Sequence, residues 1–203
     1  MNTLAVEGIG VIGAVGHRLV DGDGLSSDGW LVSARRVPSP NHDARPPKTV
    51  ISLLVIHAIS LPPNQFGGDA IERFFTNTLP ATEHPFFATI DGMHVSAHFL
   101  IRRNGECVQF VSCLQRAWHA GVSCWQGRDR CNDFSIGIEL EGCDEQPFEE
   151  AQYVSLNALI EILTRAFPIT AIVGHSDIAP GRKTDPGPFF VWQRIVGAGA
   201  ALI

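Results

Sequence analysis

A continuous apolar run at residues 52–60, SLLVIHAIS, restricts the folds open to this chain more than any other feature. Its length and its β-branched residues are typical of a β-strand. Because the run lacks alternating polar positions, the strand that it forms must be buried on both faces. The run therefore predicts a central strand, with other strands beside it and further elements above and below.

Two other segments have the pattern of strands in the same domain. Residues 94–111, HVSAHFLIRRNGECVQFV, indicate two strands joined at Asn104-Gly105, a dipeptide strongly preferred in hairpin turns. Residues 133–142, DFSIGIELEG, indicate another strand, in which Ile136, Ile138 and Leu140 would share one face. These segments predict a sheet of several strands.

The remaining segments add one strand and two helices. Residues 170–175, TAIVGH, indicate a last short strand. Residues 149–166 have apolar side chains at helical spacing, acidic residues in the first turn and Pro168 just beyond the end, which predicts an amphipathic helix. A shorter helix fits residues 70–76. The mixture predicts the α/β fold class, with a mixed sheet covered by helices.

The bulk properties of the chain limit its organisation and its partners. Its 203 residues suit one domain, and residues 1–28, rich in glycine and aspartate, are expected to form a flexible N-terminal extension of a domain at 29–203. A formal net charge of −6 gives no support for a nucleic-acid partner. No run approaches the roughly 20 apolar residues that cross a bilayer, so no membrane partner is expected. Nothing indicates an obligate protein partner.

The cysteines favour a reducing compartment. The chain has an odd number of them without metal-finger spacing, so free thiols are the simplest interpretation. The first residues lack the basic region and the cleavage site of a secretory signal. Together these features predict a cytoplasmic protein.

Three residues form a candidate metal site. His57 and His175 each stand near the carboxyl end of an apolar strand, the edge at which α/β sheets tend to bind ligands. Asp185 follows ten residues after His175, and the prolines and glycines between them would fold the loop back. Two imidazoles and one carboxylate are a common catalytic zinc set. The alternative is a capping histidine and a turn aspartate, which is the commoner fate of such residues.

Two more residues are candidates for catalysis. Glu139 lies inside an apolar strand, where a carboxylate is costly unless it is paired or functional. It is either a general base or part of a solvated face. Lys183 lies two residues before Asp185 and could stabilise a developing oxyanion, although a solvated surface lysine is the ordinary alternative.

Aromatic and basic residues alternate at residues 116–134, RAWHAGVSCWQGRDRCNDF. Trp118, His119, Arg128 and Arg130 suit a ligand that carries sugar rings and carboxylates, although tryptophans here could equally belong to the core. His98, within an apolar strand, is expected to be a hydrogen-bonded core residue and is left out of the metal set.

Four motifs, taken in order, resemble those of the AmpD-type N-acetylmuramoyl-L-alanine amidases. These enzymes belong to a superfamily that includes phage lysozyme-type amidases and peptidoglycan recognition proteins. The motifs are LLVIHAISLPPNQFGG (53–68), VSAHFLIRRNGE (95–106), RAWHAGVSCWQGRDRCNDFSIGIELEG (116–142) and GHSDIAPGRKTDPGP (174–188). The resemblance covers roughly residues 30–192.

This resemblance implies a cytoplasmic zinc amidase of cell-wall recycling. Such enzymes cut the amide between N-acetylmuramic acid, preferably in its 1,6-anhydro form, and the L-alanine of the stem peptide, so the partner would be a small muropeptide substrate. The family fold has a mixed central β-sheet flanked by helices on both faces. One Zn²⁺ would be held by His57, His175 and Asp185, with Glu139 as the catalytic glutamate and Lys183 as the oxyanion-stabilising lysine.

The substrate-binding residues follow from the same resemblance. Arg130 and the segment around Trp118 match positions that hold substrate, and His119 and His94 are further candidates. Two more substrate-binding candidates depart from the family pattern: Ala58 stands where asparagine is usual, and Phe86 stands where tyrosine is usual.

Two alternatives of different kinds stay open. A non-catalytic muropeptide-recognition module would share the fold, but such modules typically lack one metal ligand, so the presence of Asp185 favours an enzyme. A lytic amidase that acts on intact peptidoglycan is the other alternative, and the missing secretory signal argues against it.

Overall fold

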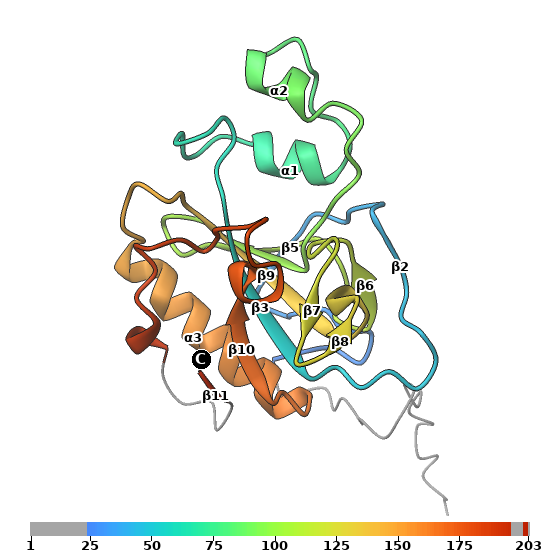
Figure 1. The fold of residues 1–203 in the computed structure, drawn as a ribbon. Helices are drawn as coiled ribbons and strands as arrows, with labels where there is room; N and C mark the ends of the chain where they lie inside the picture. The colour runs from blue at the N-terminus through green and yellow to red at the C-terminus, as the bar shows by residue number, and fades with distance from the viewer. Residues whose placement is uncertain (1–23, 196–200, 203) are drawn as a thin grey trace, which may run out of the picture.

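The computed structural model describes residues 24–195 and 201–202, and a seven-stranded mixed sheet lies at its centre (Figure 1). The only antiparallel neighbours in this sheet, among the described residues, are β4 and β5. In spatial order the strands are β1 (Arg35–Arg36), β5 (Cys107–Gln109), β4 (Phe99–Ile101), β9 (Ser135–Glu141), β3 (Leu53–Ile59), β10 (Ala171–Gly174) and β11 (Ala201–Leu202).

The apolar run at residues 52–60 forms β3, in the interior of the sheet as predicted. It pairs with β9 on one side and β10 on the other, parallel to both. Its residues 53–56 are at most 1% exposed. The predictions of strands at residues 133–142 and 170–175 are also confirmed, as β9 and β10.

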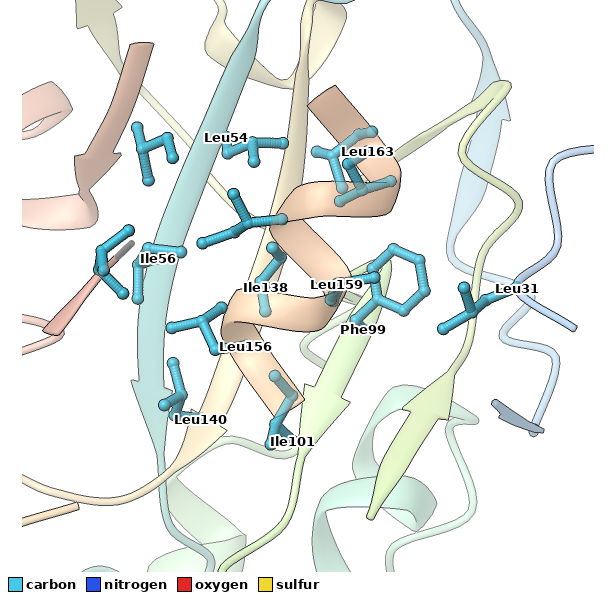
Figure 2. Close-up of a cluster of buried hydrophobic side chains, with 14 of the residues drawn as sticks. Leu31, Leu54, Ile56, Phe99, Ile101, Ile138, Leu140, Leu156, Leu159 and Leu163 are labelled. Atoms are coloured by element: carbon cyan, nitrogen blue, oxygen red, sulfur yellow. The ribbon is translucent and has the colours of Figure 1, made fainter. Parts of the chain in front are cut away.

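Helix α3 (Glu150–Ala166) covers one face of the sheet, where the amphipathic pattern predicted a helix. Its Leu156, Leu159 and Leu163 point toward the apolar side chains of β3, β9 and β4 (Figure 2). Burial of each such leucine removes enough apolar surface from water to contribute about 1.5–3 kcal/mol. At its start Glu149 and Gln152 form a capping box, which satisfies free backbone N–H groups of the first turn.

Shorter helices cover the opposite face, so the predicted helices on both faces are confirmed. Helix α1 (Ala70–Phe75) matches the short helix expected at 70–76, and it packs with α2 (Pro85–Thr89) against the outer side of the β4–β5 hairpin. Helix α4 (His175–Ile178) packs against β3 and β10 through the buried Ile178.

The β4–β5 hairpin turns where the Asn104-Gly105 dipeptide predicted. Gly105 has a φ of 86°, and a Cβ at this position would lie 2.9 Å from the carbonyl oxygen of Ala151 in α3. Only glycine meets both demands. The smaller elements are β2 (His42–Ala44), which pairs with β6 (Gln115–Ala117), β7 (Cys124–Trp125), which pairs with β8 (Arg128–Asp129), and the 3₁₀ turns η1 (Cys131–Asp133) and η2 (Trp192–Arg194).

The folded part of the chain begins before residue 29, earlier than the sequence suggested. Leu25 is 1% exposed and belongs to the core cluster under α3, and Ser112 donates a hydrogen bond to the carbonyl of Asp28. Burial of Leu25 therefore adds residues 24–28 to the domain. The rest of the expected extension, residues 1–23, lies outside the described residues.

All five cysteines carry free thiols, as predicted. Within the described ranges, no helix combines the length and the apolar character that a membrane crossing requires.

Candidate active site and metal centre

Three adjacent strands bring the candidate residues to one edge of the sheet. His57 in β3 lies directly opposite Glu139 in β9, and because the strands are parallel and in register, the two side chains leave the same face. On the other side of β3, Gly174 pairs with Ile56, so that His175 follows at the level of His57. The strand order β9-β3-β10 thus places Glu139, His57 and His175 side by side.

The loop after β10 returns its second half to the same point. The strand ends at Gly174, and His175 begins α4 instead of ending the strand as expected. The backbone N–H of Ser176 donates a 2.9 Å hydrogen bond to the carbonyl of Asp185, which places Asp185 beside His175. A Cβ on Gly174 would lie 2.8 Å from Cδ of Pro186, so this close return requires glycine.

The three expected metal ligands meet as a compact triangle of atoms. Nδ1 of His57 lies 3.0 Å from Nδ1 of His175, and Oδ2 of Asp185 lies 3.1 Å from each of them. Both histidines are buried and the Asp185 side chain is 17% exposed. Ligands of a tetrahedral zinc ion with bonds of about 2.0–2.1 Å lie roughly 3.3 Å apart. The triangle therefore has the size of a zinc ligand set.

The protonation of these groups also suits a cation. Nε2 of His175 lies 3.1 Å from the carbonyl oxygen of Ala120, which can only accept, so Nε2 carries the hydrogen and Nδ1 offers its lone pair. Burial lowers the pKa of His57 to about 4, so that its imidazole is neutral at pH 7. Burial acts to raise the pKa of Asp185, but the two neighbouring histidines outweigh burial and keep the carboxylate ionised. A cation would satisfy all three atoms at once.

Glu139 is a buried carboxylate beside this triangle. It is 9% exposed, and its Oε2 is buried without a hydrogen-bond partner among the described residues. Burial, and then the charge of Asp185, raise its pKa well above the usual value, while Lys183 opposes the shift. The solvated-face interpretation is wrong, because every residue of β9 is buried. An unpaired oxygen is free to exchange a proton with a bound molecule.

These groups line a cavity of about 290 Å³ that has a polar end and an apolar end. Its polar end contains the three ligand residues, Glu139 and Lys183, whose side chain is exposed. Its apolar end is formed by residues from the loop after β3, from α1 and α2 and from residues 90–118, namely Leu61, Phe74, Phe75, Phe86, Ile90, Met93, Val95 and Trp118. A ligand could thus rest an apolar body against one wall and present a polar group to the other.

Only some of the expected substrate-binding residues line this cavity in the structure. Ala58, Phe86, Trp118 and His119 line the cavity. The exposed His94 lines a neighbouring cavity of about 180 Å³, which shares Phe74, Ile90 and Met93 with the first. Arg130 lines neither of these two cavities. Its side chain is 70% exposed and pairs with Asp133 at 3.3 Å.

Two residues at this end of the sheet were missed by sequence reasoning. Asp43 accepts a hydrogen bond from the indole N–H of Trp118 at 3.3 Å, and a hydrogen bond from Arg116 lowers its pKa. Arg182 donates to the carbonyl of Ala120 at 2.7 Å. Asp43 gives no local signal, but Arg182 lies within the motif GRKTD and could have been proposed from its position.

His98, which was left out of the metal set, is a core residue as expected, and Cys131 is another buried residue near the site. His98 is fully buried, accepts a hydrogen bond from the backbone of Gly137 and lies 3.1 Å from the carbonyl of Gln115. Cys131 is also fully buried, and burial raises the pKa of its thiol, which makes it a poor nucleophile.

A mixed sheet whose edge joins two imidazoles, a carboxylate and a buried glutamate defines an α/β protein with a site that could hold a metal ion. Comparison with known families makes this specific. Residues 47–188 match the family described as N-acetylmuramoyl-L-alanine amidase. The chain belongs to this family, and its class of enzyme is that of the N-acetylmuramoyl-L-alanine amidases.

Individual relatives agree with this assignment. The chain is 58% identical over 172 residues to the 1,6-anhydro-N-acetylmuramyl-L-alanine amidase AmpD of Enterobacter cloacae, a match that covers 84% of this chain and 92% of that one. A crystal structure of an AmpD derivative superposes with a TM-score of 0.81 at 56% identity, over 84% of this chain and 96% of that one. The resemblance seen in the motifs is therefore confirmed.

A more distant structure contains a ligand. It is the complex of the Escherichia coli amidase AmiD with the substrate anhydro-N-acetylmuramic acid-L-Ala-D-γ-Glu-L-Lys. This structure is 36% identical to the chain, with a TM-score of 0.54, and the match covers 71% of this chain and 56% of that one.

Proposed function

We propose that this protein is a cytoplasmic, zinc-dependent amidase of muropeptide recycling. It hydrolyses the amide between N-acetylmuramic acid, preferably in the 1,6-anhydro form, and the L-alanine of the stem peptide. The name of the Enterobacter cloacae relative specifies the 1,6-anhydro sugar, and the AmiD complex contains a substrate with that sugar. The triangle formed by His57, His175 and Asp185 supports one Zn²⁺ per chain.

The observation that carries this proposal is the unpartnered Oε2 of Glu139 next to the ligand triangle. Leaving a buried carboxylate oxygen without a partner costs stability, and the fold has no structural need for it. A hydrolase needs a carboxylate in this state, because the oxygen must be free to take a proton from water.

In the proposed mechanism each polar residue has one task. Zn²⁺ bound by the triangle would lower the pKa of a water molecule and polarise the scissile carbonyl. Glu139 accepts the proton of the attacking water at Oε2 and passes it to the departing nitrogen of L-alanine. Its raised pKa favours the first transfer, because a stronger base takes the proton of water more readily. Lys183, on the same cavity, stabilises the oxyanion by its positive charge.

The cavity walls suggest how the muropeptide is held. The Trp118 ring lies on the apolar wall with its N–H fixed by Asp43, so its face can pack against the sugar. Ala58 and Phe86 line the same cavity, at positions where the family usually has the amide of asparagine and the hydroxyl of tyrosine. We assign to these two replacements a change in substrate preference or in the rate of hydrolysis. Arg130, exposed outside the cavity, and His94 in the neighbouring cavity would contact the distal part of the stem peptide.

The test is to compare three substrates: a soluble 1,6-anhydro-muramoyl tripeptide, the same tripeptide on a reducing N-acetylmuramic acid, and intact sacculi. Mass spectrometry would identify the products. We expect free tripeptide and anhydro sugar, with the highest kcat/KM for the anhydro substrate. A higher specific activity on sacculi would contradict the recycling assignment and favour a lytic amidase. Binding of the anhydro substrate without cleavage would instead favour a recognition module.

A further inference from the structure

Two consecutive residues lie behind both histidines of the ligand triangle. Nδ1 of His119 lies 2.9 Å from Nε2 of His57, the ring nitrogen that faces away from the triangle. The carbonyl oxygen of Ala120 lies 3.1 Å from Nε2 of His175. Residues 119–120 therefore contact the outward nitrogen of each histidine, while both Nδ1 atoms face the metal position.

We propose that His119 is a positioning residue for the metal centre, which fixes the ring and the tautomer of His57, as the Ala120 carbonyl does for His175. This inference rests on the zinc site of the proposed function. It also changes the expectation for His119, which was a substrate-binding candidate: although its ring borders the cavity, its two nitrogens face protein groups.

The hydrogen-bond partners of His119 allow one consistent arrangement of protons. For Nδ1 of His57 to bind metal, its hydrogen must be on Nε2, where it is donated to Nδ1 of His119. The hydrogen of His119 is then on Nε2, which lies 3.1 Å from Oγ of the fully buried Ser135. The chain from His57 through His119 to Ser135 is thus satisfied with both rings neutral.

The backbone of residues 119–120 is held firmly in this position. The side-chain oxygen of Asn132 accepts hydrogen bonds from the backbone N–H groups of His119 and Ala120, at 3.1 and 2.8 Å. Arg182 donates to the Ala120 carbonyl at 2.7 Å, from the loop that also carries Asp185. The segment is therefore fixed from both sides of the site.

The imidazole of His119 also fits tightly against β9. A Cβ placed on Gly137 would lie 2.5 Å from Cγ of His119 and 2.6 Å from its Nδ1. No side chain can be accommodated at that distance, so any residue other than glycine would push the ring away from His57. Gly137 leaves the space in which His119 packs, and this packing is independent of the hydrogen bonds.

The experiment measures zinc affinity directly. Purified full-length wild type and the variants His119→Ala, His119→Asn and Ser135→Ala are titrated with Zn²⁺ against a chromophoric chelator, and the visible spectra of their Co²⁺ forms are recorded. Outer partners of a metal-bound histidine typically contribute about 10- to 100-fold to affinity. We expect that loss for His119→Ala, with a changed Co²⁺ spectrum, and a smaller loss for Ser135→Ala.

Two variants, His119→Asn and the additional Leu159→Ala, separate positioning from a general effect on folding. In His119→Asn the side-chain oxygen stands where Nδ1 stood and can accept from His57, so most of the zinc affinity should return. Leu159→Ala, in the core under α3, should lower Tm without changing the zinc Kd. It is the control for lost stability.

Other results would overturn the inference. One is a wild-type zinc Kd and Co²⁺ spectrum in His119→Ala together with a raised KM, which would return His119 to the substrate-binding residues. If His119→Ala does not fold, an unchanged zinc Kd together with an unchanged Co²⁺ spectrum in Ser135→Ala would overturn it equally. A wild type that binds no zinc would contradict the proposed function itself.

Discussion

At the scale of one residue, Glu139 shows that this site includes a reactive carboxylate at a cost in folding stability. The alternation of β9 places Glu139 on the same face as the ligand triangle, and the packing of the surrounding chain buries it. A glutamine there would remove the charge and keep the shape, which suits a purely structural position better. That the chain has a carboxylate with a free oxygen indicates a chemical use.

Replacing this carboxylate tests that use. We predict that Glu139→Gln lowers kcat by at least about 100-fold, the usual contribution of a positioned general base. The zinc content and the KM should stay close to wild type, and Tm should be equal or higher, because a buried charge is lost. Steady-state kinetics, metal analysis and thermal unfolding of the same preparation measure all four. Retention of full kcat would contradict the role of Glu139.

Single residues also show how far the sequence could predict the site. His57 and His175 were placed together because each stands near the carboxyl end of an apolar strand, and Asp185 because a loop rich in proline and glycine can return on itself. The role of His119 could not be predicted, since it depends on contacts with His57, Ser135 and Gly137. Nothing local distinguishes a histidine that supports another from one that contacts a ligand.

At the scale of elements, long periodic segments were predictable and short ones were not. The predicted strands and α3 follow patterns set by burial in one continuous core. Helix α2 has five residues and begins with His84 as its cap, whose ring accepts from the backbone of Phe86. Histidine is not among the usual capping residues, and five residues carry no periodicity. Contacts with the rest of the cavity wall define such elements.

The position of α1 depends on a charged cluster that the sequence also did not reveal. Glu72 of α1 accepts two hydrogen bonds from Arg35 of β1, at 2.7 and 2.9 Å, and one from Arg102 at 2.5 Å. Arg102 also lies 3.3 Å from the buried Glu141 at the end of β9. The cluster ties α1, which supplies Phe74 and Phe75 to the cavity, to the sheet that carries Glu139.

This cluster predicts a pH dependence of stability. The hydrogen bond from Arg35 lowers the pKa of Glu72, so its contribution is present above the unfolded pKa of about 4.5 and is lost as the pH falls through the folded value. We predict that Glu72→Gln lowers the free energy of unfolding at pH 7 by about 1 kcal/mol, since Glu72 is partly exposed. The difference from wild type should shrink below about pH 4.5.

Urea unfolding between pH 3.5 and 7 measures this difference. Glu83→Gln is the matched control, because Glu83 accepts two hydrogen bonds from Arg73 on an exposed surface and should show a smaller change. A deficit in Glu72→Gln that is the same at every pH would show that lost packing, and not the charge, is responsible.

At the scale of the whole molecule, the sheet provides the common frame for the metal centre, the buried base and the cavity. β3 and β9 carry His57 and Glu139 in register, and the loop after β10 supplies His175, Lys183 and Asp185. The opposite face, packed under α3, keeps these strands fixed. The site is therefore held by the core itself, and the loops complete it.

The most direct test of the proposed function is the dependence of amide cleavage on zinc. The purified protein would be stripped with a chelator, its metal content measured, and one equivalent of Zn²⁺ returned before the release of free tripeptide from a 1,6-anhydro-muramoyl tripeptide is assayed. We predict that activity disappears with the metal and returns at one Zn²⁺ per chain, but does not return in Asp185→Ala, which lacks one ligand atom. Full turnover by protein that contains no metal would contradict it.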